Sequence, residues 1–490
     1  MTWTFTTWSP DDGPGEVHDS SQPQVWDNLT SYYTNGNGNP ALERIFEIAR
    51  QHGVVSVVRE YRYIDADWRS QHAGFYNGTF RRYPSVCHRL HFFTRPVPTD
   101  LAELGNLQDA YRGYTVLRPL SMSPVGRTMI AAPPEILDAV RCEGDDTIDL
   151  FGWRLQIRAM PFISQDAQYL RCAHAALWMV LAHARLVHGL PRRLPAEIHD
   201  AALGGVIVGR QLPSDGLSGQ QMLGALTALG LSPSILSLPA DRAADASAGH
   251  LSLHGVLCRY INSAMPPIVA SQVHAWVVTA YLRKPREGHG AIQLWRHDDV
   301  RGPYLPVEDP WNEPNPAHRP WSAAYLPLLP KTYLDAERAE AVGRSWVAAF
   351  ASTDHYKSTT LEQADIRPSP EEQRTLRTYL VDSRAYKQRL KERGVPPVLA
   401  SAYRLTFMPR YIWVVEIVDR KRRRAGLPDV LGEVILDSTM AQYAPLSDPG
   451  VVALHADQFA YLPGIDHGGV TLPEVPAGIA YSSGCPNLHR

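Results

Sequence analysis

The chain has 490 residues, of which 44% are hydrophobic and 20% are charged. These proportions are ordinary for a globular protein, and the length allows two or three domains. The formal net charge of −2 argues against a general role in binding nucleic acids or membrane surfaces. The five cysteines are scattered and include no Cys-x-x-Cys pair, so they suggest neither a disulfide framework nor a zinc ribbon.

Targeting signals are not apparent either. The N-terminus has no basic segment followed by an apolar stretch, and no apolar run approaches the roughly 18 residues of a membrane span. We therefore expect a cytoplasmic protein.

Composition changes along the N-terminal part of the chain. Residues 1–40 are rich in Pro, Gly, Asp, Ser and Asn, which predicts a flexible lead-in. Residues 41–158 read as an α/β region, with a helix over 41–52 and strands near 54–58, 89–93, 114–120, 126–130 and 148–158. The segment 61–83 is dense in Tyr, Arg and Asp, which fits either a recognition surface or an amphipathic helix with a solvated face.

A long apolar helix is predicted to begin at Cys172. Residues 173–187 are rich in Ala, Leu, Met and Val and contain no Gly or Pro, and Gly189 and Pro191 then end the run. The run is apolar nearly all round, which indicates a buried helix. A thiol attacks a carbonyl only as the thiolate, and a helix N-terminus and a nearby imidazolium both favour that form. Cys172 is therefore a candidate nucleophile.

Two later strands supply candidate partners for this thiol. His274 stands at the start of the β-branched run Val277-Val278-Thr279, where a strand would hold a general base rigidly. Asp298 follows the next strand candidate, 291–295, and would orient the imidazole. Asp299 beside it, and Asp309 in the later Asp-Pro turn, are rivals for this role.

Glutamines precede the thiol. The Gln165 amide, together with the backbone N–H of Cys172, could donate hydrogen bonds to an oxyanion. Gln168 is the alternative donor.

Read in order, these residues resemble the C39-like branch of the papain-fold cysteine peptidases. The resemblance covers about residues 160–310, a third of the chain, and departs from the family in Ala173 after the Cys and in an Asp turn without its Pro. It rests on Gln165 and on three segments: Cys172-Ala173-His174-Ala175-Ala176-Leu177-Trp178-Met179, His274-Ala275-Trp276-Val277-Val278-Thr279-Ala280-Tyr281 and Asp298-Asp299-Val300-Arg301-Gly302. A helix near 218–230 also looks like one that such domains place between Cys and His.

The resemblance implies an α+β protein with a papain-like domain over residues 159–330, in which a central helix packs on an antiparallel sheet. It implies a cysteine peptidase that cleaves a peptide or isopeptide bond through a Cys-His-Asp triad and a thioester, without a metal or other cofactor. A cysteine acyltransferase or deamidase of the same fold remains an alternative, as does an inactive papain-like binding module. The expected partner is a peptide or protein substrate, not nucleic acid or a membrane, and the oligomeric state stays open.

Residues 331–490 are expected to form a C-terminal α+β region. An amphipathic helix is predicted over 335–351, and two strands over 411–418 and 430–437. The basic run 420–424 lies between these strands. It could meet an acidic partner, although a solvated loop is the simpler reading.

Overall fold

A computed structural model describes most of the chain. The described residues are 5–7, 15–98, 101–204, 212–283, 292–313, 315, 318–351, 374–440, 454–456, 459–463, 469–471 and 480–488. Contacts divide the chain into two compact units. The first unit comprises Met1–Asp241, Met265–Arg283 and Ile292–Pro327, and the second comprises Arg242–Ala264, Lys284–Ala291 and Leu328–Arg490. Within the described part of the chain, no helix is long and apolar enough to cross a membrane.

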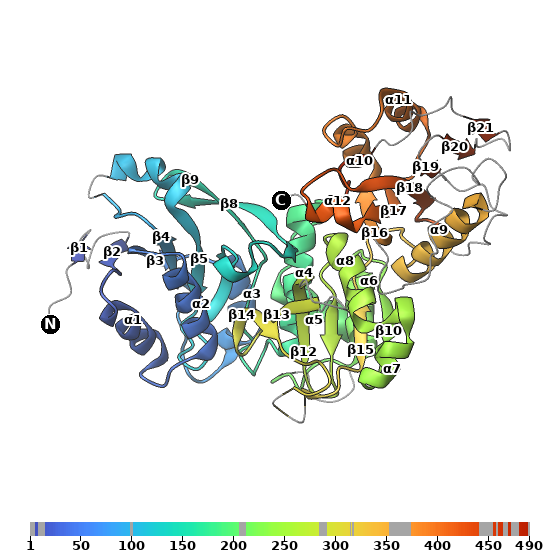
Figure 1. The fold of residues 1–490 in the computed structure, drawn as a ribbon. Coiled ribbons are helices and arrows are strands. Elements are labelled where there is room, and N and C mark those ends of the chain that lie inside the picture. The colour runs from blue at the N-terminus through green and yellow to red at the C-terminus, as the bar shows by residue number, and fades with distance from the viewer. Residues whose placement is uncertain are drawn as a thin grey trace. The chain divides into compact units, whose positions relative to one another are not determined.

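The first unit begins with a six-stranded antiparallel sheet whose strands follow one another in sequence order. The strands are β1 (Phe5–Thr7), β2 (Gly15–Asp19), β3 (Ser56–Tyr63), β4 (Cys87–Phe93), β5 (Tyr111–Leu117) and β6 (Val125–Ile130). Helices α1 (Gln24–Thr34) and α2 (Pro40–Gln51) lie between β2 and β3, and α3 (Ala66–Gly74) follows β3 (Figure 1). Leu42, Ile45 and Phe46 form the buried face of α2, as the apolar spacing predicts.

A second antiparallel sheet in this unit carries the residues of interest. Its order is β10-β15-β11-β12-β13-β14, and the short strand β7 (Val140–Arg141) also pairs with β12. The strands are β10 (Ser234–Ser237), β11 (Ile268–Ala270), β12 (Ala275–Arg283), β13 (Ile292–Asp298), β14 (Gly302–Val307) and β15 (Ala323–Leu326). A separate hairpin consists of β8 (Gly144–Leu150) and β9 (Trp153–Ala159).

The helix α4 (Cys172–His188) packs against β11 and β12 of this second sheet (Figure 1). Its side chains are buried from Ala173 to Leu181, which explains why the run is apolar nearly all round. Gly189 ends the helix with a left-handed φ of 67°, a conformation that favours glycine. The helices α5 (Pro195–Leu203) and α6 (Gly219–Ala228) contact α4, and Ser218 caps α6.

A loop held by Asp166 leads into α4. The buried Asp166 carboxylate accepts hydrogen bonds from three successive backbone N–H groups through Oδ1, those of Gln168 (2.9 Å), Tyr169 (2.7 Å) and Leu170 (2.9 Å). The Asp166 N–H in turn donates to the Leu170 carbonyl. This closed turn fixes the direction from which the chain enters the helix at Cys172.

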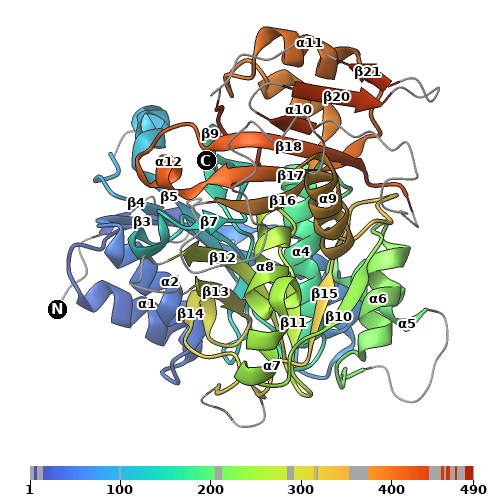
Figure 2. The same ribbon diagram turned by 45° about the vertical axis from the view of Figure 1, so that its right-hand side comes forward.

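The second unit is built around a third antiparallel sheet. Its strands are β16 (Arg374–Asp382), β17 (Tyr411–Asp419), β18 (Val430–Asp437), β19 (Leu454–Ala456), β20 (Phe459–Pro463) and β21 (Gly469–Thr471). The described helices of this unit are α7 (Arg242–Ser247), α8 (Leu253–Asn262), α9 (Ala336–Ala351), α10 (Ser383–Arg389), α11 (Pro397–Leu405) and α12 (Arg420–Arg424). Figure 2 shows α9 lying along β16, β17 and β18.

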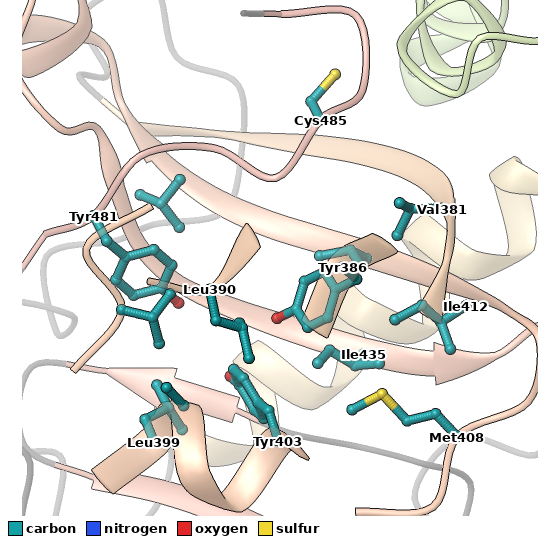
Figure 3. Close-up of a cluster of buried hydrophobic side chains, with 14 of the residues drawn as sticks. Val381, Tyr386, Leu390, Leu399, Tyr403, Met408, Ile412, Ile435, Tyr481 and Cys485 are labelled. Carbon is teal, nitrogen blue, oxygen red and sulfur yellow. The ribbon is translucent and has the colours of Figure 1, made fainter. Parts of the chain in front are cut away.

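Both faces of this third sheet are covered, so β17 is apolar along almost its whole length. Ile412 and Val414 belong to the face that packs with Leu390, which follows α10 directly, and with Tyr403 of α11. Figure 3 shows Ile412, Leu390 and Tyr403 in this cluster. Val415 points to the opposite face, toward α9. A Cβ added at Gly343 would lie 2.8 Å from Val415 Cγ2, so glycine lets this helix and the sheet approach closely.

Buried ion pairs at the same sheet lie beside the C-terminal segment, which is hydrogen-bonded to one of them. Arg377 Nη1 lies 2.9 Å from Glu416 Oε2, and Arg393 Nη2 lies 2.9 Å from Glu433 Oε2. Ser483 Oγ donates to Glu416 at 2.7 Å. The Gly484 N–H also donates to Glu416, at 2.8 Å, so hydrogen bonds to this paired carboxylate hold residues 483–484 in place.

The expected α+β class is confirmed, since helices combine with several antiparallel sheets. The predicted helices over 41–52, 173–187, 218–230 and 335–351 correspond to α2, α4, α6 and α9. The predicted strand over 148–158 is wrong in one respect: the chain reverses at Phe151 and Gly152, so this segment belongs to the two strands of a hairpin. Within the lead-in predicted for residues 1–40, the chain forms β2 and α1, and α1 is anchored by the buried Trp26 and Leu29.

Replacing Asp166 with Ala should destabilise the first unit. Three backbone N–H groups would lose a charged acceptor, and we expect a loss of about 2–4 kcal/mol in the free energy of unfolding. Asp166→Asn is the matched control, because its Oδ1 can still accept these bonds. Urea denaturation followed by tryptophan fluorescence measures the difference, and equal stability of the two variants would contradict this role of the turn.

Candidate active site

Cys172 is the first residue of α4 and the most accessible of the cysteines. Arg171 before it is extended, with φ of −101° and ψ of 173°, so the helix begins abruptly at the thiol. The side chain is partly exposed, whereas Cys87, Cys142, Cys258 and Cys485 are buried. The first N–H groups of a helix have no intrahelical acceptor, which makes this position favourable for negative charge.

His274 reaches this thiol from the start of β12. A tight turn sets its backbone, in which Ser271 Oγ accepts from the His274 N–H at 3.2 Å and the Ser271 N–H donates to the His274 carbonyl at 2.9 Å. The imidazole is buried and lies near enough to the Cys172 thiol for the thiol to raise its pKa. The structure therefore brings together the two residues that the sequence pattern paired across about a hundred positions.

Two buried carboxylates lie beside the imidazole. His274 Nε2 is 3.3 Å from Asp299 Oδ1 and 3.9 Å from Asp298 Oδ1. At 3.3 Å the Asp299 pair has the separation of an ion pair without the alignment of a hydrogen bond. Asp299 is thus the nearer of the two carboxylates to the ring.

The two carboxylates have different surroundings. Asp298 Oδ2 accepts from Trp276 Nε1 at 3.1 Å, and its Oδ1 accepts from the N–H groups of Val300 and Arg301 at 3.0 Å each. Asp298 therefore holds the turn after β13 and the neighbouring tryptophan. Asp299 makes no such backbone or indole contacts among the described residues, and its carboxylate faces the imidazole.

The His274 ring is held in its charged form. Burial by itself would lower its pKa, but the contacts with Asp299 and Cys172 and the charge of Asp298 outweigh burial and raise the pKa to about 10. Burial raises the pKa of Asp299, against the opposing effect of His274. Because the ring keeps its proton well above neutral pH, the pair is an imidazolium and a carboxylate at neutral pH.

Aromatic and cationic side chains frame the imidazole. His274 and Trp276 are two residues apart and so point to the same face of the strand, with ring centroids 4.8 Å apart. The Arg296 guanidinium lies over the Trp276 ring at 4.7 Å and pairs with Glu313. The ring of His318 stacks on His274, also at 4.8 Å, with an interplanar angle of 16°.

The remaining predicted residues lie in loops. Gln165 is in the segment between β9 and α4, where its carbonyl accepts from Ser123 Oγ, and no described contact ties its amide to the site. The Gln168 carbonyl accepts from the Ser214 N–H at 2.7 Å. Asp309 is in a turn and accepts from the Trp311 N–H at 3.1 Å. The oxyanion role of Gln165 or Gln168 stays a prediction.

His274, Asp298 and Asp299 also have the composition of a metal site. One ligand atom from each lies within 4.8 Å of the others. However, Asp298 already accepts three hydrogen bonds, and a metal bound to His274 would compete with the thiol for the ring. The donor set thus fits an imidazole paired with carboxylates better than a metal centre.

Sequence reasoning missed two side chains that shape this site, Trp276 and His318. Trp276 had a readable signal, since it stands two positions from His274 in a strand-like run. His318 comes from the long connection between β14 and β15, and no sequence pattern indicates that this connection returns to His274.

Neither a scan against protein-family models nor a search of curated proteins gave a match to this chain.

Asp299→Asn should lower the pKa of His274. The substitution removes the negative charge of the nearest carboxylate, whose contact with the ring raises this pKa most. Two-dimensional NMR of histidine-labelled protein should show His274 titrating near pH 10 in the wild type and at clearly lower pH in the variant. His52→Gln, which removes a partly buried histidine bonded to the carbonyls of Ala131 and Ala132, is the control and should leave His274 unchanged.

The same shift gives a pH dependence of stability. The folded-state pKa of His274 lies above the unfolded value of about 6.5, so protonation favours the folded state. This contribution is complete below about pH 6.5 and is lost as the pH rises through about 10. The measurement is the free energy of unfolding of the wild type and of Asp299→Asn at pH values between about 6.5 and 10. If it falls no more in the wild type than in the variant, the assigned ion pair is contradicted.

Proposed function

We propose that this protein is a cysteine hydrolase that cleaves a peptide or isopeptide bond. The observation that carries the proposal is a partly exposed thiol at a helix N-terminus, next to a buried histidine whose Nε2 lies 3.3 Å from a buried carboxylate. In this arrangement Cys172 is the nucleophile, His274 is the acid and base, and Asp299 orients the ring. Asp298 supports the site through its turn and Trp276.

The reaction begins with the thiolate of Cys172 attacking the carbonyl carbon of the scissile bond. A carbon–sulfur bond forms, and the carbonyl oxygen becomes an oxyanion. The imidazolium of His274 then gives its proton to the amide nitrogen, the carbon–nitrogen bond breaks, and the amine leaves. The two carboxylates beside the ring keep that proton on it until it is needed, against the opposing effect of burial.

The second half of the reaction hydrolyses the thioester. The neutral His274 takes a proton from water, the resulting hydroxide attacks the acyl carbon, and the thiolate of Cys172 leaves. The acid is released and the ion pair is restored. The atoms balance as the addition of one water across one amide bond, and no metal or organic cofactor takes part.

The oxyanion would be stabilised at the start of α4. The backbone N–H of Cys172 lies at the helix N-terminus, where the helix dipole favours negative charge. The Gln165 side chain would be the second donor, and Gln168 is its alternative. The Asp166 turn fixes the backbone between these glutamines and the thiol.

The wider assignment rests on the resemblance to C39-like papain-fold peptidases. An α-helix that begins at the thiol and packs on an antiparallel sheet is compatible with it, as is the order Cys, His, Asp along the chain. We accordingly propose a papain-like domain, a peptide or protein substrate and a reducing compartment such as the cytoplasm, where a catalytic thiol persists. An acyltransferase would use the same thioester and differ only in the second nucleophile.

Alkylation by iodoacetamide tests the activated thiol without knowledge of the substrate. At neutral pH, Cys172 should react much faster than the four buried cysteines, as mapped by mass spectrometry. His274→Ala should slow this reaction by about tenfold or more, because an unassisted cysteine is only a few per cent thiolate at this pH. His52→Gln should react as the wild type does.

Either of two results would count against the proposal. One is a Cys172 that reacts no faster than the other cysteines in a correctly folded protein, which would favour an inactive binding module. The other is fast alkylation that does not depend on His274. Incubation of the wild type and Cys172→Ala with a peptide library, with and without an added amine, then separates hydrolysis from acyl transfer.

A further inference from the structure

His318 lies directly on the face of His274, although it is 44 positions later in the chain. The ring centroids are 4.8 Å apart and the planes differ by 16°. His318 also meets Trp276 edge-on, at 5.3 Å and 80°, while Trp276 meets His274 at 4.8 Å and 70°. Each of the three rings therefore contacts the other two. The His274 ring is stacked with His318 and meets Trp276 edge-on.

The stacked pair consists of one charged ring and one neutral ring. The Asn315 amide Nδ2 lies 3.3 Å from His318 Nε2, and an amide N–H can donate only to an unprotonated ring nitrogen. Partial burial and the charge of His274 also lower the pKa of His318. A cation over the face of a neutral aromatic ring is favourable, whereas two cations so stacked repel.

Other charges near His318 are already engaged. Those that face it are His274, Asp298, Arg296 and Glu313. Arg296 and Glu313 form a buried ion pair with each other, and Asp298 accepts from Trp276 and from two backbone N–H groups. A proton gained by His318 is therefore felt mainly by His274, the group directly against it.

We propose that His318 is a positioning residue that, while neutral, clamps the His274 imidazolium against Trp276 and, when protonated, repels it and reduces the reactivity of Cys172. This inference rests on the proposed function and adds regulation of the same site by mild acid. The stack fixes the plane of the ring that must serve both the thiol and Asp299. It also makes the charge on that ring depend on a second, partly exposed titrating group.

The test is the pH dependence of Cys172 alkylation by iodoacetamide between about pH 5 and 8, the range in which histidines titrate. In the wild type, the rate should fall below about pH 6.5. His318→Phe keeps a flat ring that cannot be protonated, so the fall in its alkylation rate should begin at a lower pH than in the wild type. At pH 5, this variant should retain several-fold more of its neutral-pH rate than the wild type retains.

His318→Ala removes the ring and should slow alkylation throughout the range, because His274 loses the contact on its face. His318→Gln, which is neutral and small, provides a second non-titrating variant, and thermal unfolding of each variant establishes that it is folded. A purely structural role would change the stability of the variants and leave the shape of the pH profile as in the wild type.

The outcomes separate this inference from the proposed function. Wild-type Cys172 that is unreactive, or indifferent to His274→Ala, overturns both. Fast, His274-dependent alkylation whose acid fall is the same in wild type, His318→Phe and His318→Gln overturns the role of His318 alone. If the acid fall of the alkylation rate moves to lower pH in both His318→Phe and His318→Gln, the role of His318 is supported.

Discussion

The antiparallel pairing of β12 with β13 is the constraint on which the site depends. In this register Val277 lies opposite His297, so the start of β12 meets the end of β13. His274 stands just before the first strand, and Asp298 and Asp299 stand at the end of the second. The pairing therefore places two carboxylates beside one imidazole, while α4, packed on β12, brings the thiol near the same ring.

This arrangement is electrostatically demanding. His274, Asp298 and Asp299 are all buried, and a buried charge without a partner is costly. The cost is offset because Asp298 accepts three hydrogen bonds and Asp299 faces the imidazolium. Such a cluster is not needed for stability, because apolar residues of similar volume would stabilise the fold at least as much. Perturbed groups gathered beside an accessible thiol are more typical of a reactive site.

Much of the site's framework could be predicted from the sequence, because its elements have strong local signals. The apolar run after Cys172 could only be a buried helix, and Val277-Val278-Thr279 favours a strand. The choice between Asp298 and Asp299 could not be made, because it depends on how the chain turns after β13, where the pairing with β14 shifts register. The stacking of His318 on His274 could not be predicted either, because it depends on the path of the long connection between β14 and β15. Helices such as α1 and α8 were not predicted because their segments contain turn-forming or polar residues. Their helical structure depends on tertiary packing.

The central claim of the proposed function is that His274 activates Cys172 as a nucleophile. The most direct measurement is the far-ultraviolet absorbance of the thiolate, taken as the difference between the wild type and Cys172→Ser across a pH titration. The account predicts a thiolate signal from Cys172 that is already present at neutral pH and that disappears there in His274→Ala. A difference signal that is absent at neutral pH and rises only in alkaline solution, equally with and without His274, would contradict it.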